Sequence, residues 1–171
     1  MTPVDTSPTY EVVDTPDGPF VIVERVGAVV AAGWSKDVGA ILGRASLGPA
    51  DASRATLASA DAVRAWYLGD SAALDAVPIQ QSGTEFQAAV WAELRQIPCG
   101  EVRRYGEVAE VLGRPGASRA VGAACGRNAV ALFVPCHRVV GASGKLTGFA
   151  WGVDIKRSLL ARERTAPMLS S

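Results

Sequence analysis

The stretch "YGEVAEVLGRPGASRAVGAACGRN", residues 105–128, decides the fold of the C-terminal half of the chain. Its apolar residues recur at helical spacing on both sides of "GRPGAS", which has the composition of a tight turn. The pattern predicts a short helix from about Tyr105 to Leu112 and a second helix capped by Ser118. Two short helices joined by a tight turn form a helix-turn-helix.

The second of these helices has almost no side-chain bulk. After Arg119 the chain reads Ala120, Val121, Gly122, Ala123 and Ala124. So smooth a surface permits close approach to another helix or to a nucleic-acid groove. The residues alone leave both possibilities open.

Downstream, "VPCHRVVG", residues 134–141, contains the only histidine of the chain, directly after a cysteine. Cys136 is therefore a candidate nucleophile with His137 as its base. An isolated Cys-His pair is also compatible with two buried structural residues.

The sequence upstream of residue 105 indicates a small sheet with helices. Apolar runs at 19–24 and 26–34, separated by turn residues, predict strands joined by tight turns. Helical spacing predicts one helix that opens with an N-cap at Asp51 and ends at Gly69, and another that follows a cap at Thr84 and ends at Pro98. The expected fold class is thus mixed α/β (α+β), with a sheet-plus-helix domain over residues 1–80 and a mostly helical domain over residues 81–171.

The bulk properties are those of a globular protein. The 171 residues have a formal net charge of zero, but residues 1–100 carry net −6 and residues 101–171 net +6. A basic C-terminal part is expected where a polyanion binds. No apolar run reaches the roughly 20 residues that cross a bilayer, and the N-terminus lacks the pattern of a signal peptide, so we expect a cytoplasmic protein. An odd number of cysteines and a single histidine favour neither a disulfide framework nor a structural zinc site.

Residues 83–163 closely resemble the methylated-DNA–protein-cysteine methyltransferases, the O6-alkylguanine-DNA alkyltransferases. Pro-Cys-His-Arg-Val follows an Arg-Ala-Val-Gly helix and precedes Leu-Leu-Ala-Arg-Glu, and this combination is specific. "IPCGE" and "WGVDIKRSLLARE" look most like the alkyltransferase domain of the bacterial adaptive-response regulator. The resemblance implies a ribonuclease-H-like N-terminal scaffold and a winged-helix-like C-terminal domain.

The same resemblance implies roles for individual residues. Cys136 would accept the alkyl group in a single, irreversible turnover, with His137 and Glu163 as its relay. Asn128 would tie the recognition-helix turn to the active-site segment. The substrate base would contact Tyr105, Val139 and Phe149.

The implied partner is double-stranded DNA with alkylated guanine, and with O4-alkylthymine as a second substrate. A base in a duplex is out of reach of a buried thiol, so the nucleotide must rotate out of the stack. Arg119 would fill the vacated space, while Ala120, Gly122 and Ala123 let their helix lie against the minor groove. The candidates for phosphate contacts are Arg103, Arg104, Arg114 and Arg127, each of which is also compatible with a plain surface charge. No cofactor and no metal are expected, and the free protein is expected to be monomeric.

The sequence departs from the family pattern in two segments. "NAV" stands where many members have Asn-Pro-Val, which should leave the turn after Asn128 less rigid. In "TGFAWG", Phe149 replaces a common tyrosine and Trp151 a common glycine, so the resemblance does not fix the width of the pocket.

Three other functions remain to be weighed. A lesion-binding protein of the alkyltransferase-like type lacks the motif cysteine, which this chain has. A transcription regulator would fit the helix-turn-helix, but these residues contain no cysteine-rich or additional DNA-binding domain. A cysteine hydrolase would need an oxyanion hole, for which no motif is visible.

Overall fold

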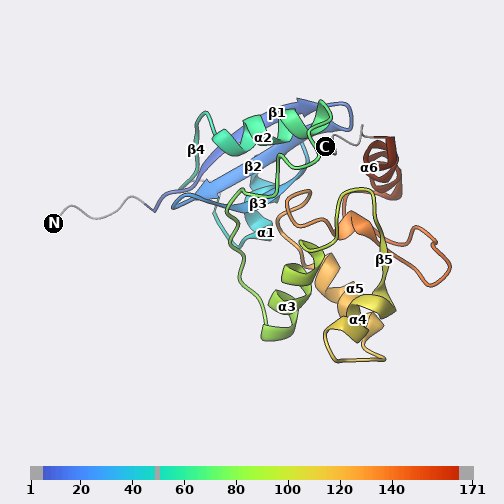
Figure 1. Ribbon diagram of the computed structural model, residues 1–171. Coiled ribbons are helices and arrows are strands. Elements are labelled where there is room, and N and C mark those ends of the chain that lie inside the picture. The colour runs from blue at the N-terminus through green and yellow to red at the C-terminus, as the bar shows by residue number, and fades with distance from the viewer. Residues whose placement is uncertain (1–5, 49–50, 166–171) are drawn as a thin grey trace. The chain divides into compact units, whose positions relative to one another are not determined.

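The computed structural model describes residues 6–48 and 51–165. It consists of two compact units, and the division falls between Gln81 and Ser82. The first contains a sheet with two helices and the second is mostly helical, so the mixed α+β class is confirmed (Figure 1). In the part of the chain that is described, no helix is both long and apolar enough to cross a membrane.

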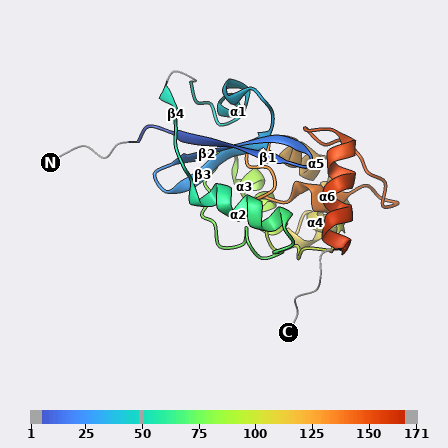
Figure 2. The ribbon, with the colours of Figure 1, turned by 90° about the horizontal axis from the view of Figure 1, so that it is seen from above.

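The sheet of the first unit has the order β3-β2-β1-β4. Strands β1 (Thr9–Thr15), β2 (Gly18–Arg25) and β3 (Ala28–Trp34) are antiparallel neighbours, and β2 and β3 correspond to the two predicted apolar runs. Both faces of β2 are covered, because its consecutive residues 20–23 are all fully buried. Figure 2 shows the sheet between helices α1 (Val38–Arg44) and α2 (Ala58–Tyr67).

The turn between β2 and β3 consists of Val26 and Gly27, and both have positive φ, 51° and 78°. Two central residues with positive φ define the type I′ turn, whose twist matches that of a hairpin. Gly27 adopts this conformation without steric cost, whereas Val26 is a β-branched residue for which it is unusual. The two-residue loop fixes the register of the hairpin.

The helix expected from Asp51 begins seven residues later, at Ala58, so the prediction of an N-cap at Asp51 is wrong. The intervening residues extend the sheet instead, as the short strand β4 (Ser53–Arg54), which pairs parallel with β1. The backbone N–H groups of Ser53 and Ala55 donate to the carbonyls of Pro8 and Tyr10, at 3.2 and 2.9 Å. These sheet bonds hold the segment extended, against its local helical pattern.

The second unit begins with α3 (Glu85–Leu94), which has the expected start: the Thr84 side chain accepts from the Gln87 backbone, and the Gln87 side chain accepts from the Thr84 backbone. The unit continues with β5 (Arg103–Arg104), α4 (Tyr105–Val111), α5 (Ser118–Gly126), one turn of 3-10 helix (Cys136–Arg138), β6 (Val139–Val140) and α6 (Val153–Thr165). Strands β5 and β6 pair in parallel.

Helices α4 and α5 pack against each other as the predicted helix-turn-helix. The expected cap at Ser118 is not found, because Ser118 is the first residue of α5 and its N-cap, Ala117, makes no side-chain capping bond. The buried side of α5 consists of Val121 and Ala124, and the Trp91 indole donates to the Ala124 carbonyl at 2.9 Å. Helix packing therefore uses one side of α5 and leaves the other open.

Candidate functional site

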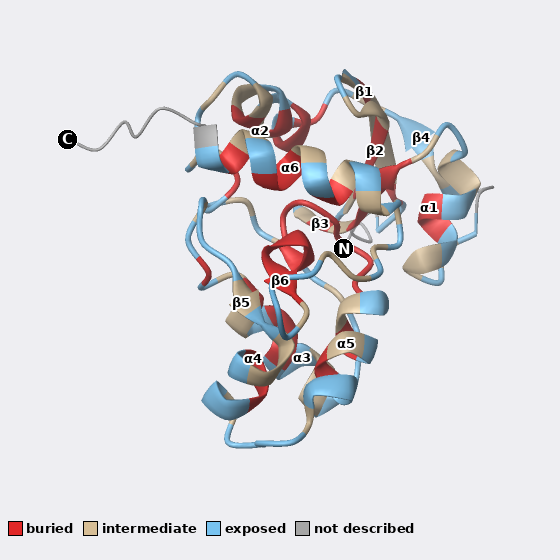
Figure 3. Ribbon diagram, turned by 90° about the vertical axis from the view of Figure 1, so that its right-hand side faces the viewer, coloured by how far each residue is buried: buried red, intermediate tan, exposed pale blue. Residues whose placement is uncertain are grey.

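The segment that carries the Cys-His pair is buried throughout. Every residue from 128 to 140 is buried, and Figure 3 shows this segment within the second unit, with exposed surfaces on α4 and α5 outside it. Leu132 has a positive φ of 71°, so the chain turns sharply here. A non-glycine residue in this conformation persists only where its surroundings hold it.

Asn128 holds the segment through its side-chain amide. Its Nδ2 donates to the Val134 carbonyl at 3.0 Å and to Cys136 Sγ at 3.3 Å, and its Oδ1 accepts from the Val130 N–H at 3.0 Å. Asn128 thus spans the turn and reaches the candidate nucleophile. These bonds connect the end of α5 to the segment of Cys136, with Ala129 and not proline following Asn128.

His137 and Glu163 lie side by side in the interior. Nε2 of His137 is 3.1 Å from Oε1 of Glu163, and each side chain is 1% exposed. The two atoms are not aligned as a hydrogen bond, and within the described residues neither ring nitrogen has a hydrogen-bond partner. Burial lowers the pKa of His137, which Glu163 opposes and which Arg138 and Lys156 reinforce. The imidazole is therefore kept neutral.

The Glu163 carboxylate is kept ionised. Burial would raise its pKa, but His137 and Arg138 lower it more strongly, to about 2. Sequence reasoning missed Arg138, which is 7% exposed and forms a bidentate ion pair with Glu163. The available signal was an arginine inside residues 129–140, which are otherwise apolar apart from His137.

Lys156 is a second charged residue that the sequence analysis missed. It is fully buried on α6, one turn before Leu159 and Leu160 and two turns before Glu163, which are buried as well. Its Nζ donates to the Thr147 carbonyl at 3.0 Å and lies 6.0 Å from the centre of the Tyr105 ring. Burial lowers the pKa of Lys156, and negative charge on Cys136 or Cys125 opposes that shift.

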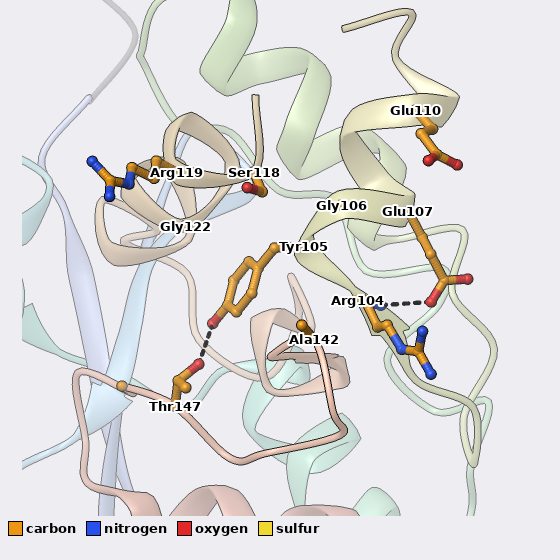
Figure 4. A pocket seen from close by; sticks show the side chains of 11 residues that line it. Arg104, Tyr105, Gly106, Glu107, Glu110, Ser118, Arg119, Gly122, Ala142 and Thr147 are labelled. Atoms are coloured by element: carbon orange, nitrogen blue, oxygen red, sulfur yellow. Dashed lines mark hydrogen bonds between the residues drawn. The ribbon is translucent and has the colours of Figure 1, made fainter. Parts of the chain in front are cut away.

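A cavity of about 680 Å³ opens beside Tyr105 (Figure 4). The cavity is formed by the starts of α4 and α5 and by the loop after β6. The lining residues are Arg104, Tyr105, Gly106, Glu107, Glu110, Ser118, Arg119, Gly122, Ala142, Thr147 and Gly148. Two of the expected base contacts, Val139 and Phe149, are not part of this lining; Val139 is fully buried and Phe149 is half-buried.

Tyr105 lines this cavity, and its pKa responds to the charge of Cys136. Its hydroxyl accepts a hydrogen bond from Thr147 Oγ1 at 3.4 Å. A Cβ on Gly122 would lie 3.9 Å from its ring, in ordinary van der Waals contact. Burial raises the pKa of Tyr105, the bond from Thr147 opposes this, and the charges of Cys125 and Cys136 raise it further. The phenol therefore keeps its proton at neutral pH.

The open side of α5 has the residues expected to meet DNA. Arg119, Ala120 and Ala123 are exposed and Gly122 is half-buried. Arg119 extends from the first turn of α5 away from Tyr105 (Figure 4). Of the expected phosphate contacts Arg103 is half-buried, and the exposed ones are Arg104, Arg114 and Arg127.

None of the three cysteines, all within the described part of the chain, forms a disulfide. Cys99 and Cys125 are half-buried, whereas Cys136 is buried. Burial, and next the charge of Cys136, raises the pKa of Cys125 to about 12, against the effect of Lys156. Cys125 is thus a protonated thiol at neutral pH and a poor nucleophile.

These features define a thiol-dependent group-transfer protein built on a helix-turn-helix. The model of the family described as 6-O-methylguanine DNA methyltransferase, DNA binding domain, matches residues 85–165. The chain is 38% identical over 168 residues to the methylated-DNA–protein-cysteine methyltransferase of Mycobacterium bovis, covering 91% of this chain and 92% of that one. It is 52% identical over 103 residues to the protein of that name from Shigella flexneri, a match that spans 60% of each chain.

A solved structure, Mycobacterium tuberculosis OGT in complex with DNA, is similar over 92% of this chain and 94% of that one, with a TM-score of 0.78 and 35% identity. The chain belongs to the methylated-DNA–protein-cysteine methyltransferase family. The family expected from the motif residues is thereby confirmed.

Proposed function

We propose that this protein repairs DNA by direct reversal, moving the alkyl group from O6 of an alkylated guanine to Sγ of Cys136 and remaining alkylated. The observation that carries the proposal is the buried group of Cys136, His137 and Glu163, with Asn128 bonded to the sulfur. A sulfur nucleophile suits displacement at an sp³ carbon, and a thioether is not hydrolysed. O4-alkylthymine is proposed as a second substrate.

The chemical step needs a base and an acid. His137 accepts the Cys136 proton, and its buried Nδ1, which bonds to none of the described residues, can receive it through a bridging water. The S–C bond then forms as the C–O6 bond breaks, and the electron pair of that bond stays on the guanine. The Tyr105 hydroxyl, which keeps its proton at neutral pH, acts as the acid and delivers a proton to the departing guanine. No cofactor takes part in this step.

The proposed partner is duplex DNA, bound through α5 with its open side in the minor groove. Small residues at the exposed positions of α5 allow close approach to the sugar-phosphate walls, and Arg119 occupies the space that the flipped nucleotide leaves. We propose that the free protein is a monomer and acts in the cytoplasm, where its cysteines stay reduced.

The test is the intact mass of the protein after incubation with duplex DNA that contains one O6-methylguanine. We expect the mass to rise by one methyl group, and peptide mapping to place that group on Cys136. Cys136→Ser should bind the same duplex without any gain in mass. Binding without a mass change in the parent protein would instead identify a lesion-binding protein, and a label on Cys99 or Cys125 would contradict the assignment of the nucleophile.

A further inference from the structure

Arg138 makes more contacts with the Glu163 carboxylate than His137 does. Its Nε donates to Oε1 and Oε2 at 3.0 and 3.1 Å, and its Nη2 donates to Oε2 at 2.6 Å. Its Nη1 donates to the carbonyl of Ile97, just after α3, at 2.6 Å. The guanidinium is therefore fixed at both ends, and its planar fork sets the orientation of the carboxylate.

The imidazole occupies the weaker position at the same carboxylate. His137 Nε2 is 3.1 Å from Oε1 without the alignment of a hydrogen bond, whereas Oε2 is bonded by Arg138. A carboxylate held in this way by a guanidinium has already had most of its charge balanced. Its attraction still raises the pKa of His137 against burial, and the Arg138 charge works in the opposite direction.

The charged groups around His137 come from the 3-10 turn and from α6. They are Cys136 and Arg138 on the turn and Lys156 and Glu163 on α6, while α3, whose buried residues are the apolar Val90, Trp91 and Leu94, also contacts the turn. Two cations and one carboxylate are thus present before any proton moves. A proton taken by His137 from solvent would add a third buried cation, whereas transfer of the Cys136 proton to His137 leaves the net charge of the site unchanged.

We propose that Arg138 is a positioning residue for alkyl transfer, which holds Glu163 in place and keeps the His137 imidazole neutral and able to accept the Cys136 proton. This role rests on the proposed function, because it concerns the base of that reaction. A protonated imidazole cannot take the thiol proton, so the guanidinium protects the reaction from mild acid. Burial is the main cause of the lowered pKa of His137, and the charge of Arg138 lowers it further.

The single histidine of the chain makes the proposal directly measurable. In untagged protein, the only imidazole C–H resonances in an NMR titration belong to His137. We expect the parent imidazole to stay neutral at pH 6.5, where an ordinary histidine is half protonated. In Arg138→Gln its titration midpoint should move up by about one pH unit or more, because the neighbouring cation is lost and the carboxylate regains its full charge. Arg138→Lys should remain close to the parent.

The rate of transfer from the free base O6-benzylguanine should follow the same order. The acid limb of its pH profile should rise by the same shift in Arg138→Gln, with rates above neutral pH within a few-fold of the parent. Arg157→Gln is the matched control, since it removes a cation from an exposed position on α6, where Arg157 pairs with the exposed Asp154. Arg157→Gln should change neither the NMR titration midpoint of His137 nor the midpoint of the acid limb of the transfer rate.

A merely structural role for Arg138 predicts a different result. The Gln variant would then be less stable, or slower by the same factor at every pH, with the His137 midpoint unmoved. An imidazole that titrates normally in both the parent and Arg138→Lys would overturn the proposal even if the Gln variant fails to fold. Because the NMR titration needs no transfer, failure of this inference is separable from failure of the proposed function.

Discussion

At the scale of single residues, Asn128 sets the position of the reacting group through one amide. Its donor and acceptor atoms bond to Val134, Val130 and the Cys136 sulfur. Asn128→Ala leaves the buried Val130 N–H and Val134 carbonyl without these partners. We expect the free energy of unfolding to fall by about 1–3 kcal/mol, measured by urea titration.

The variant Asn128→Asp distinguishes the structural role of the Asn128 hydrogen bonds from the effect of charge near the Cys136 sulfur. The carboxylate still accepts the hydrogen bond from the Val130 N–H. It has no N–H to donate, so the bonds to the Val134 carbonyl and the Cys136 sulfur are lost. Added negative charge opposes a developing thiolate, so transfer from O6-benzylguanine should be slower in Asn128→Asp than in Asn128→Ala. Equal rates in the two variants would mean that the amide has only a structural role.

The resemblance indicated Cys136, His137, Glu163 and Asn128 as site residues, and the structure brings them together. The burial of Arg138 and Lys156 could not be predicted from the sequence, for a physical reason. A charged residue is normally exposed, and it becomes buried only if a partner arrives from elsewhere in the chain. The partner of Arg138 lies 25 residues away on α6, and that of Lys156 is a backbone carbonyl in a loop.

At the scale of elements, α5 packs through one side and leaves exposed the other side, which we propose binds DNA. If Arg119 fills the gap left by the flipped base, Arg119→Ala should slow repair of a lesion in duplex DNA, because unstacking costs a few kcal/mol. Reaction with O6-benzylguanine, which needs no flipping, should be nearly unchanged. The measurement is the ratio of the two transfer rates in the variant and the parent.

Arg127 provides the control on the same helix, since it is exposed at the C-terminal end of α5. Arg127→Ala should weaken duplex binding in a salt-dependent way and leave the transfer rate from saturated duplex intact. If Arg119→Ala lost equal activity on both substrates, Arg119 would support the pocket or the fold, and the flipping role would be wrong.

The elements that sequence reasoning predicted correctly have local causes. The capping box at Thr84 and Gln87 acts within one turn, and the strands 19–24 and 26–34 are interrupted by turn residues. The start of α2 was misplaced because the residues after Asp51 bond to β1, more than 40 residues away, which no local pattern encodes. Helix α1 is short, and its cap Asp37 was not recognised.

At the scale of the whole molecule, the second unit contains the ionisable groups that should set its stability in acid. The folded-state pKa of Glu163 is about 2, against an ordinary value of 4.5. Between these pH values the carboxyl is protonated in the unfolded chain and ionised in the folded unit. The resulting stability is present above pH 4.5 and is lost as the pH falls toward 2. It is worth about 3 kcal/mol. The contribution of His137 to stability changes with pH in the same direction, because its lowered pKa makes protonation below pH 6.5 easier in the unfolded chain than in the folded unit.

We therefore expect the free energy of unfolding of the second unit to decline from pH 6.5 downward and more steeply below 4.5. The His137 resonance reports this unit alone, so urea titrations followed through it give the pH profile directly. Glu163→Gln should be less stable at neutral pH by about 3–5 kcal/mol, because Arg138 keeps a buried charge without its counter-ion. Below pH 4.5 its profile should be flatter than that of the parent. Asp154→Asn, at a fully exposed carboxylate on the same helix, should reproduce the parent profile. A Glu163→Gln profile as steep as that of the parent would show that other carboxylates govern the acid unfolding.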